Sequence, residues 1–172
     1  MVFIIKIRPI QESDKHFLWD MLFEMVYFPE GVEKPNKEEF LKQPNISKYL
    51  DGFGIKNSDS GFIAENDRNQ LIAAAWFRLF DNSNKGYGYI SDDIPELSIA
   101  VLKEYRGKGI GSKLLKALIE KAKSDGYPAI SLSVDLENTA CSLYVSAGFK
   151  KVGVSGTSWT MKLDITAISQ KI

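Results

Sequence analysis

The chain has 172 residues, and its 44% hydrophobic and 26% charged content is ordinary for a globular protein that buries a sizeable core. Its 22 Lys and Arg residues balance 22 Asp and Glu residues, so no overall field draws the chain to nucleic acid or to a membrane surface. The single cysteine and the single histidine exclude an intrachain disulfide and disfavour a histidine-based zinc site. We therefore expect a cytoplasmic protein with no metal, and with neither nucleic acid nor a membrane as partner.

The N-terminal half mixes strand and helix patterns. The apolar run in the opening MVFIIKIRPI is too short for a membrane span and no small-residue cleavage site follows, so residues 3–7 are predicted as a strand. Helical spacing of apolar residues predicts a helix over residues 17–26, and a Pro- and Asn-rich loop with a short helix near residues 37–42 follows. Residues 61–65 and 71–79 are predicted as two strands joined by a polar turn.

The C-terminal half continues the alternation. Residues 97–102 have a strong strand pattern, and a glycine-rich turn then starts an amphipathic helix that ends at Gly126. The remaining predicted elements are strands at residues 129–134, 149–154 and 159–163, and a short helix over residues 138–147. This order predicts one α/β (or α+β) domain with a mixed sheet over residues 1–172.

The turn within EYRGKGIGSKLLKALIEK has the features of an anion site. Gly107, Gly109 and Gly111 let a ligand approach the backbone closely, and the free amides and dipole of the following helix favour negative charge. Arg106 and Lys108 add cations, and residues 103–123 hold seven Lys or Arg against two Glu, a local excess of +5. Neither the P-loop nor the dinucleotide fingerprint fits these spacings, which disfavours ATP or NAD. The alternative at this point is a flexible turn before a solvated basic helix.

Two blocks resemble the GNAT N-acetyltransferases. ELSIAVLKEYRGKGIGSKLL is similar to their acyl-coenzyme-A binding segment, with Arg106, Gly109 and Gly111 at the defining positions of [QR]-x-x-G-x-[GA]. LSVDLENTACSLYVSAGFKKVG is similar to the second half of that family, including Asn138 and Tyr144. The two blocks cover about residues 96–154, and the N-terminal half matches in element order alone.

The resemblance implies a mixed, mostly antiparallel central sheet of about six or seven strands, splayed in the middle and flanked by about four helices. It implies acetyl-CoA as cofactor, with its pyrophosphate held by the turn and its pantetheine arm paired with the exposed edge of the central strand. The same arm would be hydrogen-bonded by Asn138, whose alternative role is to cap a helix. The implied cofactor-binding residues are Ile99, Ala100, Val101, Arg106, Gly107, Lys108, Gly109, Ile110, Gly111, Ser112 and Asn138.

The resemblance also suggests the catalytic groups. Glu96 opens the central strand and would act as general base, directly or through water; its alternative is a surface ion pair. Tyr144 would protonate the departing thiolate as general acid; its alternative is core packing. Cys141 has no His partner nearby and is interpreted as a small hydrophobic residue, which leaves direct attack by the acceptor amine.

The acceptor is the least determined part of the prediction. Trp76, Arg78 and Ser98 are candidate acceptor-binding residues. The segment 81–96 carries four acids against one Lys and would suit a cationic amine, whereas Arg78 would select an acceptor with a carboxylate. We expect the partner to be a small-molecule or peptide amine, and the protein to be a monomer or a homodimer.

The sequence therefore predicts an N-acetyltransferase that moves an acetyl group from acetyl-CoA to a primary amine in a ternary complex. The alternative from another class is a non-catalytic acyl-CoA-binding sensor on the same fold. Both would contain the glycine turn, and the presence of Glu96 and Tyr144 favours the enzyme.

Overall fold

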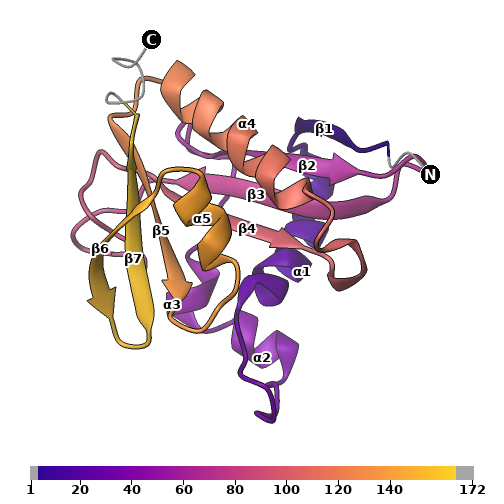
Figure 1. The fold of residues 1–172 in the computed structure, drawn as a ribbon, viewed down its shortest axis with the longest axis horizontal. Coiled ribbons are helices and arrows are strands. Elements are labelled where there is room, and N and C mark those ends of the chain that lie inside the picture. Colours follow the sequence, from indigo (N-terminus) through magenta and orange to yellow (C-terminus); the bar gives the residue numbers. More distant parts are fainter. Residues whose placement is uncertain (1–3, 166–172) are drawn as a thin grey trace.

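A computed structural model describes residues 4–165 and contains a seven-stranded mixed sheet in the order β1-β2-β3-β4-β5-β7-β6 (Figure 1). Neighbouring strands are antiparallel except β4 and β5, which are parallel. This confirms the predicted mixed, mostly antiparallel sheet. The strands are β1 (Lys6–Pro9), β2 (Ser60–Glu65), β3 (Leu71–Arg78), β4 (Glu96–Val101), β5 (Ala129–Asp135), β6 (Lys150–Ser155) and β7 (Ser158–Asp164).

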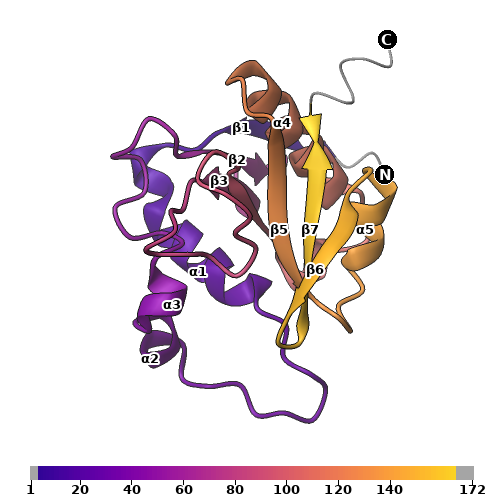
Figure 2. The same ribbon diagram turned by 90° about the vertical axis from the view of Figure 1, so that its left-hand side faces the viewer.

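Helices cover both faces of the sheet. Figure 2 shows α1, α2 and α3 on one side and α4 and α5 on the other. Two short 3-10 turns, Glu12–Asp14 and Lys103–Tyr105, precede α1 and α4. The helices are α1 (Lys15–Met25), α2 (Lys37–Leu41), α3 (Pro44–Ser47), α4 (Ile110–Ser124) and α5 (Cys141–Ser146).

The sheet has an apolar core on each face, and β3 shows why. Its side chains alternate, so Phe77 joins the core under α4 while Trp76 joins the core under α1. A strand buried on both faces reads as a continuous hydrophobic run, as LIAAAWF does. The α4 core is completed by the apolar stripe of that helix, which includes Leu114 and Leu118, both fully buried. Burying one such side chain stabilises the fold by about 1.5–3 kcal/mol.

Several predicted boundaries move. The first strand is Lys6–Pro9 instead of residues 3–7, and Phe3 lies outside the described residues. A proline is tolerated there because β1 is an edge strand that pairs only with β2. The helix predicted over residues 138–147 is the six-residue α5, because residues 136–140 form turns and irregular backbone before it. The helix α3, with Pro44 at its start, was not predicted.

No helix within residues 4–165 is both long and apolar enough to cross a membrane.

Candidate active site

The strands β4 and β5 separate immediately after they meet. Their only register pair in the described structure is Glu96 with Ser131, and the Ser131 amide donates to the Pro95 carbonyl at 2.9 Å. Beyond that point β4 pairs with β3 and β5 pairs with β7, and Figure 1 shows the two strands leaving each other. The predicted splay is confirmed. It gives Ile99, Ala100 and Val101 a strand edge that a peptide-like ligand could extend.

The glycine turn lies at the open end of this split. Gly107 and Gly109 adopt φ values of +74° and +79°, which L side chains rarely adopt, and no atom lies within 4 Å of where a Cβ would stand on either. Helix α4 begins at the next residue, Ile110, so its first amides have no acceptor inside the helix. The turn is thus an open cradle beside a helix N-terminus, which suits a diphosphate.

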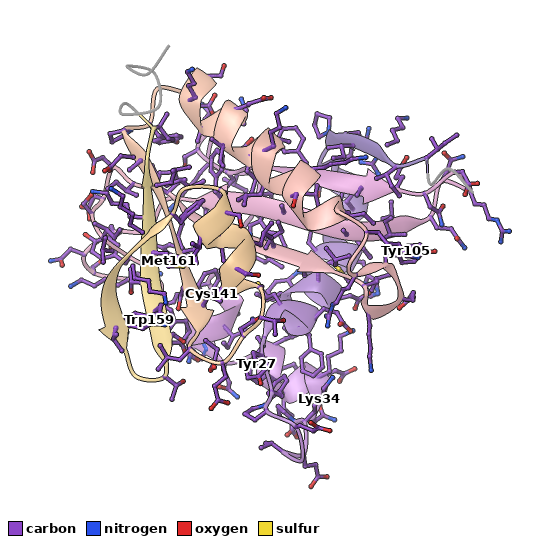
Figure 3. All side chains as sticks on the ribbon, in the orientation of Figure 1. Tyr27, Lys34, Tyr105, Cys141, Trp159 and Met161 are labelled. Carbon is purple, nitrogen blue, oxygen red and sulfur yellow. The ribbon has the colours of Figure 1, made fainter. Side chains whose placement is uncertain are left out.

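The two cations of the turn fold along the protein surface. The Arg106 Nε donates to the Val101 carbonyl at 2.9 Å, and its Nη2 lies 3.4 Å from Glu24 Oε2 on α1. The Lys108 Nζ lies 5.4 Å above the ring of Tyr105, which Figure 3 labels beside this turn. Arg106 therefore ties the turn to the end of β4.

Helix α5 packs where α4 begins. A Cβ on Gly111 would lie 3.4 Å from Leu143 Cδ2 and 4.0 Å from Val101 Cγ2, so α4, α5 and the end of β4 meet there. Tyr144 of α5 is 6% exposed, and its ring packs edge-on against Phe149 with centroids 5.9 Å apart. Burial raises the pKa of its phenol well above the ordinary value, so the group stays protonated at neutral pH.

Asn138 lies in the turn before α5 and does not start the helix. Its Oδ1 accepts from the Ala140 amide at 2.9 Å, and its carbonyl accepts from the Cys141 amide at 3.1 Å. The capping alternative is therefore wrong, because the N-cap of α5 is Ala140 and Asn138 orders the turn before it. The side chain of Cys141, labelled in Figure 3, is half-buried at the start of that helix.

Glu96 is buried at the closed end of the split, and 3% of it is exposed. Its Oε1 accepts from the Gly88 amide at 2.9 Å, and its Oε2 accepts from the Tyr49 hydroxyl at 2.6 Å. Burial raises its pKa to about 7, and the hydrogen bonds from Tyr49 and Gly88 oppose that rise. The surface ion pair considered as an alternative is thus replaced by a buried, doubly hydrogen-bonded carboxylate.

The loop between β3 and β4 covers this carboxylate closely. A Cβ on Gly86 would collide with Glu96 Oε1, and a Cβ on Gly88 would lie 2.6 Å from the Leu132 carbonyl carbon. Glycine at both positions lets the loop lie directly on Glu96 and on β5. The glycines that alternate with Tyr87 in the sequence therefore mark the contact between this loop and the site.

Two predicted acceptor-binding residues, Trp76 and Arg78, have their polar groups engaged inside the fold. Trp76 is fully buried, and its Nε1 donates to the Tyr49 carbonyl at 3.2 Å. Arg78 is 5% exposed and forms a two-bond ion pair with Asp59, at 3.1 Å and 3.0 Å. Its Nη1 also donates to the carbonyls of residues 48 and 51, both at 2.9 Å. These donors hold the backbone of residues 48–51, so the Arg78 guanidinium is already engaged inside the fold.

The third candidate, Ser98, stays beside the site. It lies two residues from Glu96 on β4 and therefore shares its face of the sheet. Within the described part of the chain, its buried hydroxyl and that of Ser131 have no hydrogen-bond partner.

The sequence pattern did not identify Tyr49 as a site residue, because residues 43–60 carry mainly turn signals and the tyrosine is 47 positions from Glu96.

A family model described as the acetyltransferase (GNAT) family matches residues 19–149, which are well over half of the chain. This chain belongs to the GNAT family. The matched region contains the glycine turn, Glu96 and Tyr144. GNAT proteins are acetyl-CoA-dependent acetyltransferases that act on amines, so the chain is an acetyltransferase by family.

Curated relatives and a solved structure agree with this assignment to GNAT. Streptothricin acetyltransferase A of Bacillus subtilis is 30% identical over 71% of this chain and 68% of that protein. The uncharacterized N-acetyltransferase YobR of the same organism is 35% identical over 53% of this chain, but the match spans 33% of YobR. The structure of yncA from Salmonella typhimurium with its cofactor acetyl-CoA has a TM-score of 0.66, at 19% identity over 94% of each chain. At that identity the likeness shows the fold.

The Arg78→Ala variant should lose about 3–5 kcal/mol of unfolding free energy, because it leaves the fully buried Asp59 side chain without its partner. The Lys121→Ala variant is the control, because it removes an exposed ion pair with Asp125 and should lose no more than about 1 kcal/mol. Urea unfolding followed by circular dichroism measures both. Equal losses in the two variants would contradict a structural role for Arg78.

Proposed function

We propose that this chain transfers an acetyl group from acetyl-CoA to a primary amine by direct attack within a ternary complex. The observation that carries the proposal is the split between β4 and β5, with the glycine turn at its open end and a buried carboxylate at its closed end. Bound acetyl-CoA would supply an activated thioester. Groups of this chain would bind the cofactor, take a proton from the amine and protonate the leaving thiolate.

The cofactor is proposed to lie along the split. The residues from Arg106 to Ser112 would surround its diphosphate, where the positive-φ glycines leave open space and the first amides of α4 need acceptors. The pantetheine arm would pair with the free edge of β4 at residues 99–101. The Asn138 side-chain amide, whose oxygen orders the turn before α5, would donate to the same arm.

The two catalytic groups are proposed to act from opposite faces of the sheet. Glu96 contacts Tyr49, which belongs to the core under α1, whereas Tyr144 belongs to the core under α4. Glu96 would take the proton of the ammonium, whose own pKa near 10 keeps it charged in water. Tyr144, which burial keeps protonated, would donate a proton to the leaving thiolate.

The acceptor would enter on the face of Glu96. The hydroxyls of Ser98 and Ser131 lie on this face, and a polar reactant at the split would give both a partner. The ion pair of Arg78 with Asp59 removes the reason to expect an acceptor carboxylate. The proposal is therefore a primary amine, on a small molecule or a peptide, with no carboxylate required.

An assay of free thiol released from acetyl-CoA with a library of primary amines tests the function. We expect turnover, with kcat/KM falling as the pH drops below about 7, because the raised pKa of Glu96 leaves its base form depleted at lower pH. Glu96→Gln should lower the rate by about a hundredfold or more and should remove this fall in kcat/KM at low pH, the acid limb of the pH profile. Tight coenzyme A binding without turnover on any amine would instead favour the sensor.

Gly109→Val should weaken coenzyme A binding by about tenfold or more, because its side chain would stand in the open cradle. The matched control is Gly126→Val at the other end of α4, where φ is +83° and the surrounding space is equally open. Both variants share the strain of a branched residue at positive φ, so they differ mainly in where the added side chain stands. Because Gly126 lies at the far end of α4 from the cradle, its variant should bind coenzyme A normally. Calorimetry gives both dissociation constants, and equal values would place the diphosphate elsewhere.

Tyr144→Phe should lower kcat by about tenfold or more while coenzyme A affinity stays unchanged, because the ring still packs on Phe149 and only the proton donor is lost. Tyr127→Phe is the control, since that half-buried tyrosine packs on Phe77 in the same core. Steady-state kinetics and calorimetry separate the two effects. An unchanged kcat would contradict the general-acid role and would indicate that Tyr144 only packs in the core.

A further inference from the structure

Tyr49 has both hydrogen-bonding roles of its hydroxyl in use inside the fold. The hydroxyl donates to Glu96 Oε2 at 2.6 Å and accepts from the Tyr87 amide at 2.7 Å. The residue is 4% exposed, and its ring lies edge-on to Phe80 with centroids 5.1 Å apart. The phenol is therefore fixed between the carboxylate on β4 and the loop that covers it.

The backbone that carries Tyr49 is fixed as well. Three hydrogen bonds from β3 hold it: Trp76 donates to the carbonyl of residue 49, and Arg78 donates to those of residues 48 and 51. Asp59 holds the other side of the Arg78 guanidinium. Arg78 is also the register partner of Glu96 on the neighbouring strand. The ion pair and the tryptophan thus set where the Tyr49 hydroxyl stands relative to the carboxylate.

The carboxylate needs this donor. Burial favours the neutral acid, which cannot accept a proton, and each hydrogen bond received by the carboxylate favours the charged form. The Gly88 amide donates a hydrogen bond to one carboxylate oxygen and the Tyr49 hydroxyl donates to the other. Without the tyrosine donor, the second oxygen would be a buried acceptor with no partner in the described structure.

Other ionisable groups near Glu96 do not replace this donor. The attraction of Lys48 is a minor influence on Glu96, and its Nζ is bonded to the Lys85 carbonyl at the surface. Arg78 forms an ion pair with Asp59. The Tyr87 hydroxyl accepts from the exposed Asn45 side chain, whereas its backbone amide donates to the Tyr49 hydroxyl and its ring stacks on that of Tyr49 with centroids 6.4 Å apart. Among the described side chains, Tyr49 is the one that donates to the carboxylate.

We propose that Tyr49 is a positioning residue that controls the orientation and the charge of the Glu96 carboxylate. The inference rests on the proposed function insofar as Glu96 is the base of that reaction. It also assigns a task to the segment after α3: the N-terminal half of the chain supplies the group that keeps the base of the C-terminal half usable.

The test replaces Tyr49 with Phe, which keeps the ring and removes the hydroxyl. Carbon-13 NMR of glutamate side-chain carboxyls, with the Glu96 signal assigned by its loss in Glu96→Gln, follows the titration directly. We expect the Glu96 midpoint to rise by about one pH unit or more, since one unit is a tenfold change in the protonation equilibrium. The acid limb of kcat/KM should move with it, so that the rate falls about tenfold well below pH 7 and recovers at high pH.

Two controls separate this from a general loss of structure. Tyr89→Phe removes a hydroxyl that bonds to Asp92 in the same loop, and it should leave the Glu96 midpoint and the acid limb unchanged. In the Glu96→Gln background, Tyr49→Phe should add no further loss of rate, because its effect runs through the carboxylate. Thermal unfolding confirms that each variant is folded.

The possible outcomes separate the role proposed for Tyr49 from the proposed acetyl-transfer reaction. A folded Tyr49→Phe variant with an unchanged Glu96 midpoint, or a rate loss that is equal at every pH, would overturn the inference. A raised midpoint in a protein that acetylates no amine would refute the proposed function, and would still support control of Glu96 by Tyr49.

Discussion

Taking a carboxylate out of water is unfavourable unless donors replace the water, and that constraint organises the centre of this molecule. Glu96 is buried where β4 and β5 meet, and its two donors lie 8 and 47 positions away along the chain. One is the backbone of the β3–β4 loop, which reaches the carboxylate because Gly86 and Gly88 have no side chains in the way. The other is the phenol of Tyr49. The loop, the segment after α3 and the central strand must therefore be correctly placed together.

The split in the sheet leaves an open strand edge next to this buried carboxylate. A parallel pair that stays together would bury the edge of β4, whereas here the pairing ends at Glu96 and Ser131. The strands separate toward the glycine turn, where α5 and the end of β4 pack against the start of α4. The carboxylate of Glu96 contacts the core under α1, and the phenol of Tyr144 belongs to the core under α4; we propose that both act on a reactant in the split. This arrangement suits a transfer in which one group accepts a proton and another donates one.

Polar residues in the core of this protein hold other polar residues in place. Arg78 and Trp76 bind backbone carbonyls near Tyr49, and Tyr49 binds Glu96. Such a network is favourable only when its members are satisfied, because each unpaired member in the interior costs about 1–3 kcal/mol. The region that the GNAT family model matches, residues 19–149, contains every member of this network.

The sequence by itself determined the seven strands, the apolar stripe of α4 and the glycine turn, because each of these depends on residues that are neighbours along the chain. Glu96 was proposed as a base from the resemblance to the GNAT family. Strand periodicity, helix periodicity and the φ > 0 preference of glycine are local properties. Only the tertiary structure decided that Trp76 donates to the backbone of Tyr49, that Arg78 pairs with Asp59, and that Tyr49 donates to Glu96. Those contacts join residues 19 to 47 positions apart, and their partners are chosen by the path of the chain and by the need to pair buried charges, which no local pattern records.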